Sequence, residues 1–225
     1  MQYIIKKAIT SPELQGLWSG PAWKDANIAT INHFLPESSN HHPRTEAKVL
    51  YDRDGLYVLF RAMDQYVICT RDVNQQITSK DSCVEVYFQP FPQRSDIGYL
   101  NFEMNCGGTI LLYYITDPIR CEETIFKERT IVPQHLIDTM KIYHSLPKTV
   151  PVEIKDPIEW TVEYFIPFSL FEHYVPQLNI QSGAKWRGNF FKCADESSHP
   201  HWASWSPVHE FNFHVIKYFG DLIFE

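Results

Sequence analysis

Short segments in which apolar side chains occupy every second position dominate this chain. Residues 46–64 read EAKVLYDRDGLYVLFRAMD, with two such segments on either side of a turn at 52–55. A period of two places alternate side chains on opposite faces of an extended strand, whereas an amphipathic helix needs a period near 3.6. No segment carries a long helical stripe of apolar residues. The pattern therefore predicts an all-β chain with a hairpin over 46–64.

Further strands are expected over 81–90, 99–114, 140–146, 158–171, 185–193 and 214–225, with a helical turn at 168–174. Pro90 and Pro167 end two of them, because a proline cannot donate to a strand ladder. One face of each long strand is apolar and is expected in the core. These core residues are Leu56, Val58, Phe60, Ala62, Val84, Val86, Phe88, Leu100, Phe102, Met104, Trp160, Val162, Tyr164 and Ile166.

Length and composition fit a single compact unit. The chain has 225 residues, and its 15 prolines outnumber its 9 glycines. An excess of proline over glycine is typical of short strands joined by rigid turns. We therefore predict one domain over residues 1–225, an antiparallel β-sandwich of jelly-roll or immunoglobulin-like type with about ten strands.

The charge balance argues against two classes of partner. The net charge is −7, and no run of five basic residues occurs, so neither nucleic acid nor an anionic membrane is expected to bind. The N-terminus lacks the apolar core of a signal peptide, which makes a cytoplasmic location the default expectation. Five cysteines without CxxC spacing disfavour a disulfide framework or a zinc knuckle.

The reverse faces of two strands carry hydrogen-bonding and aromatic groups. On 81–90 these are Glu85 and Tyr87, and on 99–114 they are Tyr99, Asn101, Glu103 and Asn105. Amides and carboxylates suit vicinal hydroxyl groups, and an aromatic ring suits the C–H face of a pyranose. The combination favours a sugar-binding face over an ordinary solvated one.

The stretch SHPHWASWSP at 198–207 holds two tryptophans in a proline-bounded loop. Trp205 has only small neighbours and is expected to fold back toward the core. Trp202 is the better candidate for an exposed aromatic platform.

Enzymatic and haem-binding alternatives stay open. The chain lacks the GxSxG, HExxH, P-loop and GxGxxG motifs, but Glu85, Glu103 and Glu163 are mid-strand carboxylates that a glycan-processing enzyme would need. A related sandwich scaffold can also host haem, ligated by Met63 or Met104 with a histidine, or serve as a protein-interaction module.

Metal sites are weaker candidates, and no metal ligand is assigned. His199 and His201 point the same way on an extended loop, whereas the adjacent His41 and His42 do not. Calcium would need loop carboxylates, for which 52–54 and Asp81 are the candidates.

Six segments, in order, resemble family 9 carbohydrate-binding modules. They are DSCVEVYFQP, YLNFEMNCGGTIL, WTVEYFIPFSLF, GNFFKCAD, SWSP and FNFHVIKYFGDLIFE, together with AKVLYDRDGLYVLF. The similarity runs from about residue 17 to the last residue. It implies a β-sandwich without catalysis of its own, which binds the end of a glycan or a small saccharide, carries structural calcium and grips the sugar with two aromatic rings.

The resemblance also assigns site residues by position. Glu85, Glu103, Asn105 and Asn189 would hydrogen-bond sugar hydroxyls, with Tyr99 and Asn101 as second-rank candidates, and Trp202 or Trp205 would supply one ring. Relatives often carry a tryptophan six residues before the strand glutamate, where this chain has Ser79. Tyr66 or a nearby residue would have to replace that ring.

Overall fold

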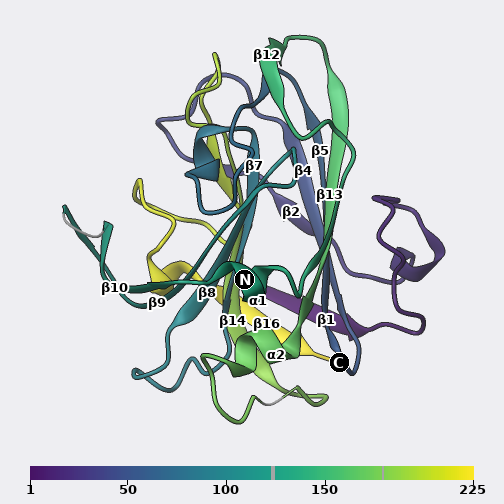
Figure 1. Ribbon diagram of the computed structural model, residues 1–225, viewed down its shortest axis with the longest axis vertical. Helices are drawn as coiled ribbons and strands as arrows, with labels where there is room; N and C mark the ends of the chain where they lie inside the picture. The colour runs from purple at the N-terminus through teal and green to yellow at the C-terminus, as the bar shows by residue number, and fades with distance from the viewer. Residues whose placement is uncertain (123–124, 179) are drawn as a thin grey trace.

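The chain folds into a β-sandwich whose two layers share one strand (Figure 1). The structure is a computed structural model that describes residues 1–122, 125–178 and 180–225. Its strands are β1 (Gln2–Lys7), β2 (Ala29–Ile31), β3 (His33–Phe34), β4 (Arg44–Tyr51), β5 (Gly55–Asp64), β6 (Val67–Cys69), β7 (Cys83–Gln89), β8 (Tyr99–Asn105), β9 (Ile110–Cys121), β10 (Ile125–Ile131), β11 (Lys141–His144), β12 (Val150–Ile154), β13 (Ile158–Pro167), β14 (Lys185–Cys193), β15 (Trp202–Ser204) and β16 (Gly220–Phe224). The helices are short: η1 (Pro21–Trp23), η2 (Thr78–Lys80), α1 (Gln134–Ile137), α2 (Phe168–Glu172) and η3 (Ile216–Tyr218).

Hydrogen-bonded neighbours run in the order β10-β9-β8-β7-β14-β16-β1-β4-β5-β13-β11. Residues 2–5 of β1 pair with β16 and residues 6–7 pair with β4, both in parallel. We call β10 to β16 in this order the first sheet and β4 to β11 the second sheet. Strand β1 passes from one to the other and joins them along one edge of the sandwich.

The predicted sandwich is confirmed, with two corrections. The described residues form sixteen strands rather than about ten, and β1 makes the pairing mixed rather than purely antiparallel. Alternation cannot reveal bridging segments of two or three residues such as β2, β3, β6 and β15. Nor can it reveal the direction in which β1 pairs. That the chain forms one domain stays a prediction.

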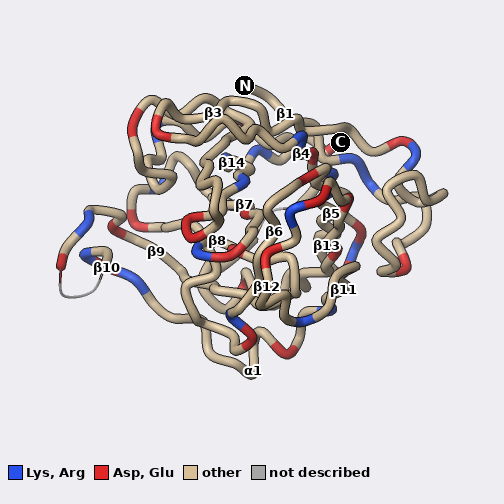
Figure 2. Tube along the Cα trace, turned by 90° about the horizontal axis from the view of Figure 1, so that it is seen from above, with Lys and Arg blue, Asp and Glu red and all other residues tan. Residues whose placement is uncertain are grey.

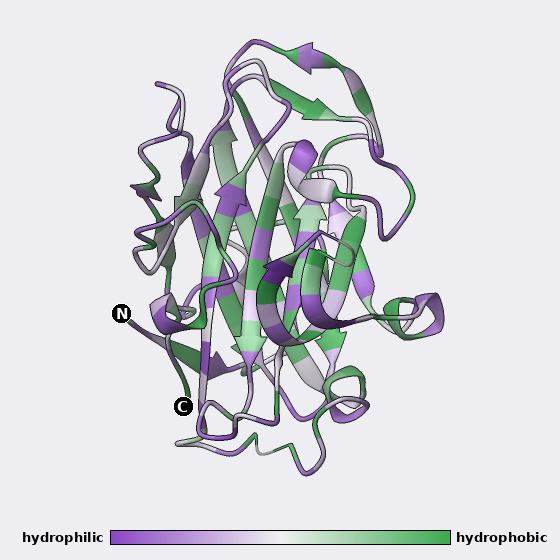
Figure 3. Cartoon of the chain, turned by 90° about the vertical axis from the view of Figure 1, so that its left-hand side faces the viewer, coloured by the Kyte–Doolittle hydropathy of each residue, from purple (hydrophilic) through white to green (hydrophobic). Residues whose placement is uncertain are grey.

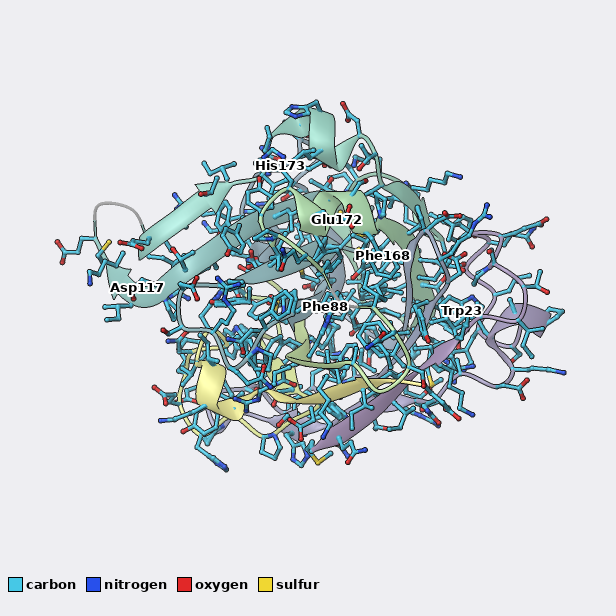
Figure 4. The ribbon with its side chains drawn as sticks, turned by 90° about the horizontal axis from the view of Figure 1, so that it is seen from below. Trp23, Phe88, Asp117, Phe168, Glu172 and His173 are labelled. Carbon is cyan, nitrogen blue, oxygen red and sulfur yellow. The ribbon has the colours of Figure 1, made fainter. Side chains whose placement is uncertain are left out.

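The predicted core faces are confirmed. All fourteen predicted core residues belong to one buried cluster, into which each sheet turns its inner face. Phe60 of β5 meets Phe190 of β14 edge-on, with 6.3 Å between ring centroids. Phe88 lies near the middle of the molecule in the view from below (Figure 4). Burial of this much apolar surface is the main force that holds the two sheets together.

Several predicted elements form where expected. The 46–64 hairpin is β4 and β5, and the Oδ1 atom of Asp52 accepts the backbone N–H groups of Asp54 and Gly55 to fix its turn. Gly108, with φ of 75°, makes the turn between β8 and β9. The helical turn is α2, but the final strand is limited to 220–224, because η3 precedes it.

The outer face of the first sheet is also covered. Alternating hydrophilic and hydrophobic bands along the strands give each sheet two distinct faces (Figure 3). A second buried cluster, the outer cluster, joins this face to Leu35, to Phe126 of β10 and to the segment after β15; it comprises Leu35, Tyr87, Tyr99, Leu111, Tyr113, Ile115, Phe126, Phe191, Val208 and Phe219. The ends of β9 and β10 project from the body as an arm, on which Asp117 lies (Figures 1 and 4).

Charged residues of both signs are scattered around the trace (Figure 2). None of the helices that the structure describes has the length and apolar character needed to cross a bilayer.

Candidate functional site

A cavity of about 280 Å³ lies on the outer face of the first sheet. Strands β7 and β8 form one wall, and the arm, the 193–202 segment and the 211–214 segment form the others. The polar groups that line it are Ser79, Glu85, Tyr87, Glu103, Tyr113, Arg120, Cys193, Asp195, Trp202, Asn212 and His214. The apolar groups are Leu35, Ile77, Leu111, Ile125, Phe126, Phe211 and Phe213.

Two carboxyl groups stand side by side in the wall of this cavity. Glu85 on β7 is directly opposite Glu103 on β8, and their exposed fractions are 2% and 7%. Burial raises the pKa of Glu85 to about 7. Burial, and then repulsion from Glu85, raises the pKa of Glu103 well above its ordinary value. Near neutral pH the pair therefore holds at least one proton and offers both donor and acceptor oxygens.

A chain of hydrogen bonds fixes Glu85 from behind. The Tyr87 hydroxyl donates to Glu85 Oε2 at 2.6 Å and also lies 3.1 Å from Nε2 of His214. Tyr99 lies on the far side of His214, with its hydroxyl 2.8 Å from Nδ1. A consistent assignment has Tyr99 donating to Nδ1 and the imidazole donating from Nε2 to Tyr87. Burial lowers the pKa of His214 well below its ordinary value, which agrees with the neutral ring that this assignment requires.

Asn101 fixes Glu103 in the same way. Its Nδ2 donates to Glu103 Oε1 at 2.6 Å, and its Oδ1 accepts the backbone N–H of Tyr113 at 2.8 Å. Tyr99 and Asn101 are both fully buried. Neither lines the cavity, so the structure places these two predicted residues behind the ones that do.

Trp202 forms part of the cavity rim and is half-buried. Its indole Nε1 donates to Asp195 Oδ1 at 2.7 Å, and the Ser79 hydroxyl donates to the other oxygen of the same carboxylate at 2.8 Å. The ring of Phe211 packs edge-on against Trp202, with 4.7 Å between ring centroids. Phe211 itself is 57% exposed. Asp195 thus sets the orientation of an indole that solvent, or a ligand, can reach.

Three other predicted residues lie away from the cavity. Asn105 donates to Asp81 and to the carbonyl of Arg71. Asn189 exchanges two hydrogen bonds with the backbone of Ser206, which ties β14 to the segment after β15. Trp205 is 4% exposed and packs edge-on against Phe190, the core position expected for it.

Tyr66 does not take the place of the missing ring. It stacks on His199 at 3.6 Å between ring centroids and lies outside the cavity. Among the residues that line the cavity, Phe211 is the exposed aromatic ring beside Trp202.

Sequence reasoning missed Arg120, Phe126, Asp195, Phe211 and His214. Arg120 belongs to the outer part of β9, beyond the predicted end of that strand at residue 114, and stacks over Phe126. The others lie on segments without alternation. Two features of the sequence could have pointed to them: the closing motif, and the high proportion of aromatic residues in 211–219.

The residues considered as candidate metal ligands have partners within the protein. The Asp52 carboxylate accepts from Ser11 and Tyr57 as well as from its own turn, and the Asp81 carboxylate accepts from Thr70, Arg71 and Asn105. Donors within the protein therefore reach both oxygens of the Asp52 carboxylate and both oxygens of the Asp81 carboxylate. His201 uses both ring nitrogens, toward His199 O and Lys192 Nζ. In the described residues, one group of three side chains has metal-binding geometry, namely Cys83, Glu85 and Cys193.

Three solved structures have the same fold. A protein of Bacteroides uniformis proposed to bind carbohydrate matches with a TM-score of 0.82 and 23% identity, covering 100% of this chain and 99% of its own. A family 9 carbohydrate-binding module of Caldicellulosiruptor kristjanssonii, in complex with cellotriose, matches with a TM-score of 0.65 and 13% identity, covering 100% and 94%. A structure of such a module from the same organism in complex with glucose has a TM-score of 0.63 and 13% identity, covering 99% and 95%.

A search among curated proteins finds no match. The family model for carbohydrate-binding family 9, in contrast, matches residues 22–224, which is nearly the whole chain. The resemblance inferred from the six sequence segments is thereby confirmed. This chain belongs to carbohydrate-binding family 9.

Proposed function

We propose that this chain binds a saccharide, without turning it over, in the cavity between β7, β8 and Trp202. The observation that carries the proposal is a reachable indole beside two fixed carboxyl groups in one cavity. Membership of a carbohydrate-binding family supports the ligand class. So do the family 9 modules with the same fold that hold cellotriose and glucose.

The cavity suits the end of a glycan or a small saccharide. Its volume of about 280 Å³ is near the lower end of small-ligand pockets, which span roughly 300–1,000 Å³. A space of this size takes a terminal sugar unit more readily than the middle of a long chain.

We assign roles to the principal groups in and behind the cavity. Glu85 and Glu103 exchange hydrogen bonds with sugar hydroxyls, and the Arg120 guanidinium donates from the arm. Trp202 stacks on the C–H face of the sugar, with Phe211 beside it as the second ring. Tyr99, Asn101 and His214 hold the two carboxyl groups in place.

Glycoside hydrolysis is the alternative function, because Glu85 and Glu103 are two neighbouring carboxyl groups with raised pKa values. A hydrolase needs its carboxyl groups on either side of the scissile bond, roughly 5–9.5 Å apart. Glu85 and Glu103 instead come from adjacent strands and directly opposed positions on one wall. We therefore propose binding rather than turnover. Of the two methionines considered as haem ligands, Met104 is fully buried in the core and does not line the cavity.

Calorimetric titration with glucose, cellotriose and a wider glycan panel tests the proposal. Trp202→Ala should weaken the best ligand by roughly tenfold, since an aromatic stacking contact contributes about 1 kcal/mol beyond its area. Val152→Ala, at a position that is 81% exposed, is the control and should bind as wild type does. Absence of binding to every sugar, equal affinity of Trp202→Ala, or turnover of chromogenic glycosides would contradict it.

A further inference from the structure

We infer that Cys83, Glu85 and Cys193 form a binding site for one Zn²⁺ ion at the inner wall of the cavity. Cys83 and Cys193 are directly opposite each other on β7 and β14, and Glu85 follows Cys83 by two positions on the same face of β7. Strand geometry therefore brings two sulfurs and a carboxylate together without any loop.

The spacing of the ligand atoms fits a tetrahedral ion. The two Sγ atoms and the Glu85 oxygen all lie within 4.8 Å of one another, and Cys193 Sγ is 3.1 Å from Glu85 Oε1. Two sulfurs bound to zinc at about 2.3 Å in a tetrahedral arrangement lie about 3.8 Å apart. Tetrahedral sulfur and oxygen ligands lie about 3.5 Å apart, so the Cys193–Glu85 pair must widen slightly, and movements of about 1 Å or less bring the three atoms to that geometry.

The donor set selects the class of metal. Two thiolates favour zinc and other soft ions over calcium or magnesium, which prefer oxygen alone. Three protein ligands leave a fourth position for water or another ligand. Glu85 and Cys193 line the cavity, so we expect an ion held by them to be open on that side.

The surroundings support the carboxylate ligand. The Tyr87 hydroxyl holds Glu85 Oε2, so that Oε1 is the oxygen facing Cys193. Such a second partner fixes the orientation of a metal-binding carboxylate.

Metal binding must displace protons. Burial raises the pKa of Cys83 to about 11 and that of Cys193 well above its ordinary value, so without metal both sulfurs are thiols at neutral pH. When zinc binds, two S–Zn bonds and one O–Zn bond form, two S–H bonds break, and the two thiol protons leave to solvent together with the proton of any Glu85 carboxyl that is protonated. The apparent affinity should therefore fall as the pH is lowered.

The test is a titration of the full chain with Co²⁺ and Zn²⁺ in the presence of a phosphine reductant. Wild type should bind one ion per chain, and the Co²⁺ form should show a thiolate charge-transfer band. Cys83→Ser and Cys193→Ser should each weaken that band, because one thiolate ligand remains, and should bind roughly tenfold more weakly or worse. Cys69→Ser, at another buried cysteine, and Cys121→Ser, at an exposed one, are matched controls and should keep both.

Wild type alone supplies a second readout if a serine variant does not fold. In partly denaturing urea, Zn²⁺ should slow the alkylation of Cys83 and Cys193 more than that of Cys69 and Cys106, because zinc covers the two ligand sulfurs directly and protects the other two only by slowing unfolding. A wild-type Co²⁺ complex without a charge-transfer band, or a band that depends on Cys69 or Cys121 instead, would overturn the assignment. No saccharide is present in these assays, so their failure leaves the proposed sugar binding untouched.

Discussion

Glu85 and Glu103 are directly opposite each other on β7 and β8, and both are buried in the wall of one cavity. Two carboxylates at such positions repel each other and lose hydration, so the folded protein keeps protons on them that the unfolded chain gives up. Two ionised carboxylates buried side by side therefore destabilise the folded state, which is expected of a ligand site that needs both carboxyl groups.

The free energy of unfolding should fall as the pH rises from 6.5 to 8.5. Raised carboxyl pKa values stabilise the fold fully below the unfolded value and lose that contribution as the pH rises through the folded value. For Glu85, whose pKa rises from 4.5 to about 7, the whole loss is about 3 kcal/mol, of which about 1 kcal/mol or less falls above pH 6.5. Burial, and then repulsion from Glu85, raises the pKa of Glu103 well above its ordinary value, so Glu103 should extend the fall in the same direction.

Glu103→Gln should flatten this fall, because its amide oxygen still accepts from Asn101 but carries no proton to lose. Urea unfolding of both proteins at pH 6.5, 7.5 and 8.5 measures the difference. The window avoids acid pH, where His201, whose pKa is lowered to about 3, makes the fold less stable as the pH falls below 6.5. If the free energy of unfolding of the two proteins fell in parallel as the pH rises, Glu103 would not be a source of the pH dependence.

Asp64→Asn should destabilise the fold by about 3–5 kcal/mol, the usual effect of leaving one member of a buried ion pair alone. Asp64 Oδ2 lies 3.3 Å from Nζ of Lys192, both side chains are fully buried, and Trp160 also donates to that oxygen. Combining it with Lys192→Met should cost less than the sum of the two single changes. Denaturant unfolding of wild type, the two single variants and the double variant at pH 7 gives the coupling free energy between Asp64 and Lys192. Strictly additive effects would argue against a coupled ion pair.

Phe211→Ala should weaken sugar binding about three- to tenfold and change the free energy of unfolding by less than about 0.5 kcal/mol. The ring is 57% exposed and touches Trp202, so its loss removes ligand contact but little core packing. Calorimetry with the best glycan measures the first quantity and a thermal melt the second. Unchanged affinity would exclude Phe211 as the second ring.

Asp195→Ala should weaken sugar binding roughly tenfold, whereas Ser79→Ala should leave it close to wild type. Asp195 Oδ1 accepts from the Trp202 indole at 2.7 Å, while the Ser79 hydroxyl, the group that this change removes, donates to the other carboxylate oxygen. Because Asp195 acts by positioning, tryptophan fluorescence and its quenching by acrylamide should change in the first variant but not in the second. A large binding loss with unaltered quenching would instead indicate direct contact of Asp195 with the sugar.

The sequence by itself determined the strands and their inner faces. Whether a side chain of β5, β7, β8 or β13 points into the sandwich depends on the period of two, which is a local property of the chain. The same alternation placed Glu85 and Glu103 on the outer face, and their direct opposition then followed from the pairing of β7 with β8.

Only the tertiary structure decided which outward groups share a cavity. Asn105 and Asn189 have the same outward pattern as Glu103, yet their amides are engaged with the protein backbone and with Asp81. Arg120, Asp195 and His214 reach the cavity from three separate segments. No periodicity encodes that meeting, because it depends on how long loops pack over a finished sheet, and such contacts join residues far apart in the chain.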